Sequence, residues 1–257
     1  MYSIDLRGKY GLVFGIANHR SIAWAIAQIL HDAGATLALT YQDDRVRTRV
    51  TKLAEEWGDV TLLECDVSND ENIAAVFDEV CQRFGALSFI IHSIAFANRE
   101  DLEGDFSNTS RQGFQTAMDI SAYSLIPIVR YAAPLMESGG SIITMTFQAS
   151  ERVYPGYNVM ATAKAALENE VRQLASQMGE KNIRINAISA GPVDTLAARG
   201  IHGFLDMKRI HAQRAPLRRN ITQEEIAKVA LFLCSDLSSG ITGTVLPVDA
   251  GYHIMAI

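Results

Sequence analysis

Short apolar runs alternate with longer amphipathic stretches along the whole chain. The runs have the length and the glycine or polar boundaries that are typical of strands. Strands are predicted at residues 10–14, 36–41, 60–63, 87–92, 141–146, 183–189 and 242–248. The run at 87–92 is apolar on both faces, which is typical of a central strand in a parallel sheet.

The stretches between these runs have helical periodicity. Ile22, Ala25, Ile26 and Ile29 fall on one face of the first stretch, which ends before Gly34. Helices are predicted at residues 21–33, 45–57, 71–84, 113–136, 157–178 and 222–234. The residues from 195 to 217 are less regular. This alternation predicts one α/β domain over residues 1–257, with a Rossmann-type, doubly wound parallel sheet of about seven strands and helices on both faces.

Composition and charge narrow the class of protein. Hydrophobic residues make up 48% of the chain and charged residues 20%, as in a globular protein. A net charge of −6 disfavours nucleic acid or an anionic membrane as the main partner. Asp5 and Arg7 interrupt any early apolar run, and no stretch reaches the ~18 apolar residues of a membrane helix. Cys65, Cys81 and Cys234 lack metal-binding spacing, so we expect a cytoplasmic protein without a metal site.

The first predicted loop has features of a dinucleotide site, because ligands of doubly wound sheets bind beyond the carboxyl ends of the strands. Gly15 permits a tight turn, and Ser21 and Ile22 open a helix whose N-terminal N–H groups suit a pyrophosphate. The loop lacks the G-x-G-x-x-G pattern, so a helix merely capped by Ser21 or Asn18 is an equal interpretation. After the third strand, Asp66 can accept from an adenine amino group or cap a turn.

The end of the second strand bears on the choice of cofactor. Gln42 can hydrogen-bond a free ribose hydroxyl, whereas Asp43 and Asp44 would repel a 2′-phosphate. NADH is therefore predicted over NADPH, although Arg45 and Arg47 follow closely. Either aspartate can also cap the next helix.

Tyr157 and Lys164 are the candidate catalytic pair. Their spacing of seven corresponds to two helical turns, which places both side chains on one helix face. The Lys164 charge stabilises negative charge next to the tyrosine hydroxyl, and that hydroxyl can donate to a substrate carbonyl. The alternative is an interfacial tyrosine and a solvated lysine. Because the pair follows the fifth predicted strand, where ligands of such sheets bind, the catalytic interpretation is favoured.

Several segments resemble the NADH-dependent enoyl-acyl-carrier-protein reductases of the short-chain dehydrogenase/reductase superfamily. They are Gly15-x5-Ser21, His92-Ser-Ile-Ala-Phe96-Ala97, Asp119-Ile-Ser-Ala-Tyr-Ser124, Tyr157-x6-Lys164 and Asn186-Ala-Ile-Ser-Ala-Gly-Pro192. The resemblance spans essentially the whole chain. It implies reduction of the trans-2 double bond of enoyl-acyl-carrier-protein thioesters by NADH, in a cytoplasmic homotetramer.

The resemblance also implies roles for individual residues. The positions that would contact the dinucleotide are Gly15, Ser21, Ile22, Gln42, Asp66, Val67, Ser93, Ile94, Ala95, Lys164, Val193, Asp194, Thr195, Leu196 and Ala197. Tyr157 would be the oxyanion donor. The substrate would lie against Ala97, Tyr157, Phe204 and Met207, under a covering segment at about 195–217.

Three positions depart from the family pattern. Phe147 stands where many of these reductases carry a second tyrosine, so it cannot donate a proton. Ala95 replaces a common glycine, and Asp194 replaces a frequent arginine, so we expect the Asp194 carboxylate to turn away from the phosphates.

Two other functions compete with this one. A ketone or alcohol oxidoreductase of the same superfamily would carry a catalytic serine at 144–145, where Thr144 and Met145 stand. A nucleotide sensor that binds NADH without chemistry would have no need of Tyr157 and Lys164.

Overall fold

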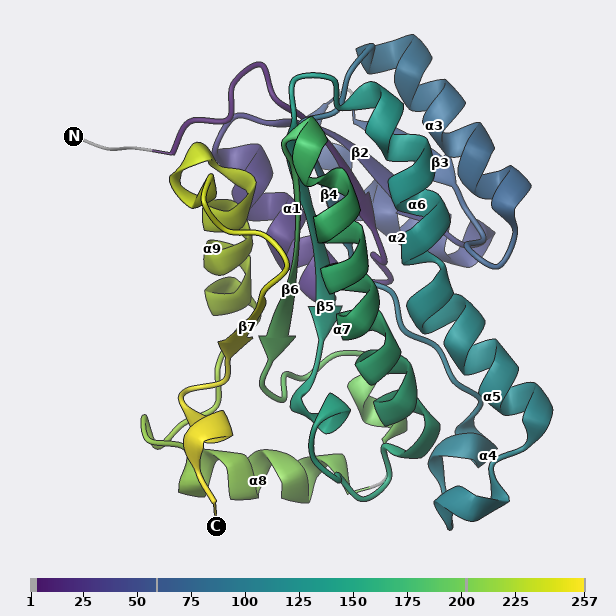
Figure 1. The fold of residues 1–257 in the computed structure, drawn as a ribbon, viewed down its shortest axis with the longest axis vertical. Helices are drawn as coiled ribbons and strands as arrows, with labels where there is room; N and C mark the ends of the chain where they lie inside the picture. Colours follow the sequence, from purple (N-terminus) through teal and green to yellow (C-terminus); the bar gives the residue numbers. More distant parts are fainter. Residues whose placement is uncertain (1–3, 59, 202, 257) are drawn as a thin grey trace.

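Seven parallel strands form one sheet in the computed structural model, which describes residues 4–58, 60–201 and 203–256 (Figure 1). They are β1 (Tyr10–Phe14), β2 (Thr36–Tyr41), β3 (Thr61–Glu64), β4 (Phe89–His92), β5 (Gly140–Thr146), β6 (Ile183–Ala190) and β7 (Val245–Val248). The sheet order is β3-β2-β1-β4-β5-β6-β7, with every neighbouring pair parallel. The strand order reverses between β1 and β4, where such sheets open a ligand crevice. The predicted fold class is confirmed.

Two layers of helices cover the sheet. The helices on one face are α1 (Ile22–Asp32), α2 (Asp44–Ala54) and α9 (Gln223–Cys234), and those on the other are α3 (Asp70–Phe84), α6 (Leu125–Ala132) and α7 (Asn158–Met178). Each face has its own buried apolar cluster. Val13 of β1 belongs to one cluster and Leu12 and Phe14 to the other, because successive residues of a strand face opposite sides.

The prediction of a single helix at residues 113–136 is wrong. The structure divides it into α5 (Arg111–Met118), a π-helical turn (Asp119–Tyr123), α6 and a 3-10 turn (Ala133–Leu135). Two residues interrupt the regular hydrogen bonds: Ser124 Oγ donates to the carbonyl of Ile120 at 2.7 Å, and Pro127 has no N–H to offer.

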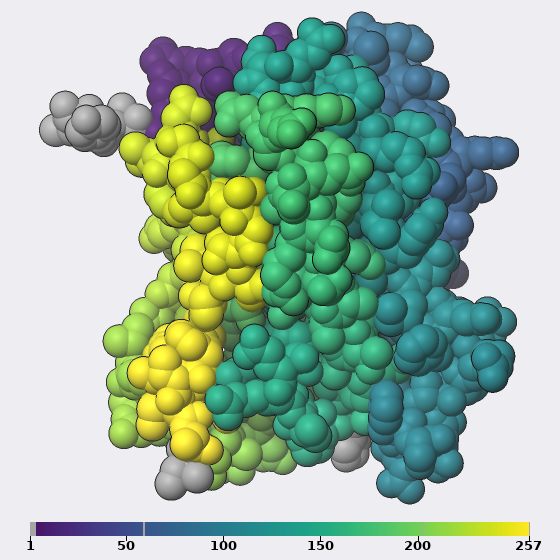
Figure 2. All heavy atoms as spheres, in the orientation of Figure 1, coloured from purple at the N-terminus to yellow at the C-terminus, as the bar shows by residue number. Residues whose placement is uncertain are grey.

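The segment at 195–217 is more regular than its sequence indicates. It contains the helix α8 (Phe204–Arg214), in which only Phe204 and His211 are buried, so its apolar periodicity is weak. Residue 202 lies outside the described residues. The His211 ring stacks on Tyr252 with centroids 4.5 Å apart, which packs the C-terminal segment (yellow in Figure 2) against this helix.

The short helix α4 (Arg99–Leu102) was not predicted. It follows β4 and lies at the lower end of the sheet in Figure 1, as α8 does. The carboxyl ends of the strands point toward this end, where the loops that carry the predicted site residues begin.

Candidate active site

Gly15 lies at the point where the loops after β1 and β4 touch. Its φ is +96°, and a Cβ built on it would lie 2.0 Å from the carbonyl oxygen of Ser93. Glycine is therefore required by the contact between the two loops as well as by the turn. The residue is exposed, so its backbone remains open to a ligand.

The Ser21 hydroxyl shapes the first loop. Its Oγ accepts from the N–H groups of Ala17 and Asn18 at 3.0 and 3.1 Å, and the Asn18 side chain accepts from Arg20 N–H at 2.8 Å. Neither side chain caps α1, which has no side-chain cap, so the capped-helix interpretation is wrong. The N-terminus of α1, beginning at Ile22, can thus offer N–H groups to an anion.

The polar residues after β2 and β3 have the capping roles that were considered. Asp43 accepts from Val46 N–H at 2.9 Å and caps α2. One carboxylate oxygen of Asp66 accepts from the N–H and the hydroxyl of Ser68 at 3.0 and 2.8 Å, which forms a turn. Gln42 is exposed, and Val67 packs half-buried against the core.

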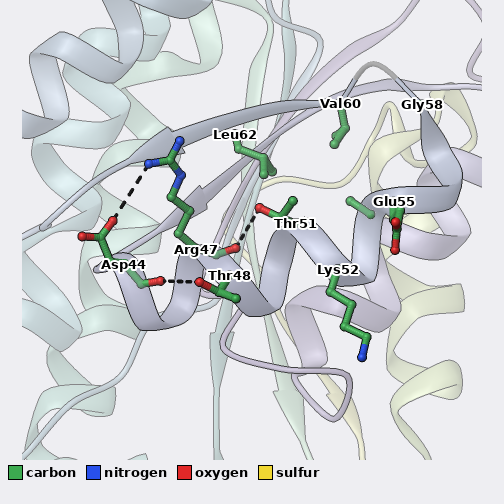
Figure 3. Close-up of a pocket in the computed structure, with 10 residues that line it drawn as sticks. Asp44, Arg47, Thr48, Thr51, Lys52, Glu55, Gly58, Val60 and Leu62 are labelled. Carbon is green, nitrogen blue, oxygen red and sulfur yellow. Dashed lines mark hydrogen bonds and ion pairs between the residues drawn. The ribbon is translucent and has the colours of Figure 1, made fainter.

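A groove of about 850 Å³ between α2 and β3 is shown in Figure 3, but it contains none of the predicted site residues. Several of its polar side chains bond within α2. Arg47 pairs with Asp44 at 4.0 Å, and the hydroxyls of Thr48 and Thr51 donate to backbone carbonyls one turn earlier. Because none of the predicted site residues lines it, this groove is not the candidate site.

A buried chain of hydrogen bonds connects β4, β5 and the π-helical turn. The two ring nitrogens of His92 lie 2.7 Å from Thr144 Oγ1 and 2.9 Å from Ser124 Oγ. Burial, and then the nearby charge of Lys164, lower the pKa of His92 to about 3, so the ring is neutral. Thr144 is fully buried and its hydroxyl bonds to His92, so it does not face a substrate as the catalytic serine of a ketone reductase would.

Ser121 supports the loop after β4, a role that its sequence pattern alone did not predict. It is fully buried, its Oγ accepts from Phe96 N–H, and its hydroxyl donates to the Phe96 carbonyl, both at 2.9 Å. This clamp fixes the loop that carries Ser93, Ile94 and Ala95. The signal in the sequence was a pair of serines inside an otherwise apolar helical stretch.

Lys164 is buried and faces backbone carbonyls. Its Nζ donates to Met145 at 2.8 Å and to Ile94 at 3.3 Å. Burial lowers the pKa of Lys164 to about 8, while the buried carboxylate of Glu168 acts in the opposite direction. An ammonium group has three donors, so one remains for a ligand.

Tyr157 is half-buried and is the residue before α7, one position outside the helix predicted to contain it. Its ring packs on Phe147 with centroids 5.1 Å apart, and Phe147 packs on Tyr154 at 4.7 Å. Desolvation raises the pKa of Tyr157, which keeps the hydroxyl protonated and able to donate. In this structure Phe147 supports the tyrosine ring by packing.

The side chain of Gln223, on α9, links the loop after β6 to the loop after β1. Gln223 Nε2 donates to the carbonyls of Arg20 and Asp194 at 3.4 and 3.3 Å. The Asp194 carboxylate pairs with Arg199 at 3.0 and 3.2 Å. Val193 is buried, Thr195 accepts from Ala198 N–H, and Leu196 and Ala197 are exposed.

A groove of about 530 Å³ lies between the α4 region and the covering segment. Arg99 and Glu103 line one side, and Asp194 and residues 199–201 and 203–206 line the other. Ala97 immediately precedes this region, and Met207 is half-buried on α8. The described contacts do not join Phe204 or Met207 to Tyr157.

No helix among the residues that the structure describes is long and apolar enough to cross a membrane. No three His, Cys, Asp or Glu side chains of the described part of the chain come together as a metal site would require.

The sequence of the chain matches a known family. The sequence model of the family described as "Enoyl-(Acyl carrier protein) reductase" matches residues 15–253. The chain belongs to the enoyl-(acyl carrier protein) reductase family. A family member from Nostoc sp., named Enoyl-[acyl-carrier-protein] reductase [NADH] FabI, is 54% identical over 99% of this chain and 100% of its own. One of the same name from Bacillus subtilis is 48% identical over 99% of each chain.

Solved structures of enoyl-(acyl carrier protein) reductases superpose closely on this chain. The Bacillus cereus enzyme with NADP+ and indole naphthyridinone has a TM-score of 0.96 and 48% identity, covering 98% of this chain and 100% of that one. The Anaplasma phagocytophilum enzyme in complex with NAD has a TM-score of 0.95 and 42% identity, covering 99% of each chain.

Proposed function

We propose that the protein reduces the trans-2 double bond of enoyl-acyl-carrier-protein thioesters to acyl thioesters with NADH, the last step of the fatty-acid elongation cycle. The observation that carries this proposal is the contact of Lys164 Nζ, on the helix that Tyr157 immediately precedes, with the loop after β4 and with the end of β5. Relatives at 54% and 48% identity are named NADH-dependent enoyl reductases.

The residues at the carboxyl edge fit a dinucleotide. Gly15 is exposed and presents a bare backbone, and the adjacent N-terminus of α1 lacks a side-chain cap. Lys164 retains one donor for a ribose hydroxyl. The fifteen positions named above as dinucleotide contacts are proposed to hold the cofactor.

The chain's own groups would then act on the substrate as follows. The bound dinucleotide supplies a hydride for the β carbon, so negative charge develops on the thioester oxygen as an enolate. The protonated Tyr157 hydroxyl donates to that oxygen, and one such donor typically contributes about 3–4 kcal/mol to the transition state. Lys164 places positive charge beside the site. Phe147 has no proton to give, so the α carbon receives its proton from water.

The substrate and the assembly belong to the same proposal. The acyl carrier protein presents the enoyl chain, Ala97, Phe204 and Met207 contact it, and the segment 195–217 covers it. The whole chain acts as one domain, and four copies form a homotetramer.

Loss of NADH absorbance at 340 nm tests the proposed activity. We expect oxidation of NADH with a crotonyl-type thioester, and none with a simple ketone or without substrate. Turnover of the ketone alone would support the ketone reductase, and binding of NADH without turnover would support the sensor. The KM for NADH should be lower than that for NADPH, because Asp43 and Asp44 would repel a 2′-phosphate.

A further inference from the structure

Asn158, the first residue of α7, has an unusual backbone. Its φ is +30°, although a helix begins at this residue and Tyr157 precedes it. Most side chains disfavour positive φ, and asparagine is among the few that tolerate it. Strain of this kind persists only where neighbouring contacts hold it.

The Asn158 side chain provides such a contact. Its Nδ2 donates to the carbonyl of Gly104 at 3.1 Å, across 54 positions of sequence. Gly104 itself has a φ of +72°, and a Cβ there would meet nothing within 4 Å. The glycine is therefore required by its backbone conformation, which turns this carbonyl toward α7.

The segment that Asn158 holds is also fixed by Asp101. This carboxylate is 4% exposed and accepts from Ser110 N–H at 3.0 Å and from the Asn98 side chain at 3.3 Å. A Cβ on Gly113 would lie 1.7 Å from the same carboxylate. Residues 98–110 are thus tied down internally, and Asn158 joins them to the catalytic helix.

The same segment forms one side of the groove described above. Arg99 and Glu103 line it opposite Phe204. Gly104 follows Glu103 directly, so a shift of its carbonyl would move this side of the groove relative to Phe204 and to Tyr157.

We propose that Asn158 is a positioning residue, which sets the width of the acyl groove by holding Gly104 against the start of α7. The inference rests on the proposed function, because it takes the groove as the place of the acyl chain. It makes Asn158 a determinant of how long chains bind.

Two variants of Asn158 remove the contact in different ways. Asn158→Asp keeps the size of the side chain but turns the donor into an acceptor that faces a carbonyl. Asn158→Gly keeps the backbone conformation and removes the amide. In both, the KM for a dodecenoyl thioester should rise about fivefold, as for the loss of one ordinary hydrogen bond. The KM for a crotonyl thioester and the Kd for NADH should change by less than about twofold.

Gly104→Ala disturbs the same contact from the other side, because alanine disfavours a φ of +72°. It should raise the KM for the dodecenoyl thioester in the same way. Asn169→Asp is a matched control, since Asn169 is exposed on the same helix. Gly85→Ala is a second control, because Gly85 has a φ of +71° and equally open surroundings away from the groove.

Amide hydrogen exchange provides a readout that is independent of activity. Residues 98–110 should exchange about fivefold faster in Asn158→Asp and Gly104→Ala, and at the wild-type rate in both controls. Unchanged exchange in Asn158→Asp, or an equal loss of activity with both chain lengths, would overturn the proposal. If the wild-type chain reduced no enoyl thioester, the proposed function would fail, and the exchange result alone would decide the positioning role.

Discussion

Tyr157 and Lys164 are prepared for their proposed roles by opposite effects of burial. Desolvation raises the pKa of the tyrosine and keeps its hydroxyl protonated. Desolvation lowers the pKa of the lysine to about 8, close to the pH of most assays. Burial therefore keeps the donor protonated and makes the cation sensitive to pH.

Removal of the tyrosine hydroxyl should affect the chemical step alone. In Tyr157→Phe we expect kcat to fall by about 10²–10³, the usual effect of losing one oxyanion donor, with the Kd for NADH unchanged. Steady-state kinetics and a fluorescence titration with NADH measure the two quantities. Tyr154→Phe is the control, because its hydroxyl donates to Gln148 and its ring still packs on Phe147. Full activity in Tyr157→Phe would refute the assignment.

The affinity for NADH should depend on pH through Lys164. Since the pKa of Lys164 is lowered from 10.5 to about 8, its positive charge is present below pH 8 and is lost as the pH rises above it. The Kd for the anionic dinucleotide should therefore increase between pH 8 and about 10. Titrations with NADH across this range measure it. Lys164→Arg should lack the rise, because a guanidinium remains charged; a constant wild-type Kd would contradict the prediction.

Among the elements, the contact between β4, β5 and the π-helical turn depends on one neutral histidine. Thr144→Val removes the hydroxyl that partners His92 Nδ1 and leaves a buried polar atom without a bond. We expect a loss of about 1–3 kcal/mol in the free energy of unfolding, measured by urea denaturation. Thr144→Ser keeps the hydroxyl and should recover most of this stability. Equal stability of the valine variant and the wild type would show that the bond contributes nothing.

The strands of the sheet could be predicted from the sequence, but the polar contacts around them could not. Buried parallel strands such as β4 are short apolar runs between turns, so their positions could be predicted to within a few residues. The π-helical turn could not, because apolar periodicity continues on both sides of it. The roles of Ser121 and Asn158 depend on distant partners, Phe96 and Gly104, which a local pattern does not identify.

The candidate site was easier to locate than to describe. All positions proposed from the sequence lie beyond the carboxyl ends of strands or on the helices that follow, because parallel strands bring those ends to one edge. Spacing alone placed Tyr157 inside α7, whereas it precedes the helix and Asn158 has a left-handed backbone.

At the scale of the whole molecule, the proposed homotetramer can be tested directly. Phe114 on α5 is 40% exposed and Tyr123, in the π-helical turn, is 41% exposed. Exposed aromatic side chains of this size are candidates for burial in an interface between copies of the chain. Light scattering after gel filtration should give four times the chain mass of 28.2 kDa. A mass equal to one chain would contradict the assembly. A Phe114→Glu variant should lower the mass if this helix lies in the interface.

The π-helical turn has a consequence for how this protein can change. A wide turn accommodates one additional residue while the helix keeps its course on either side. Shortening the chain by one position there would leave α5 and α6 packed as before, yet it would withdraw Ser121 from the Phe96 backbone or Ser124 from His92. Deletion of a single codon in this turn would therefore remove a contact that supports the site without changing the fold.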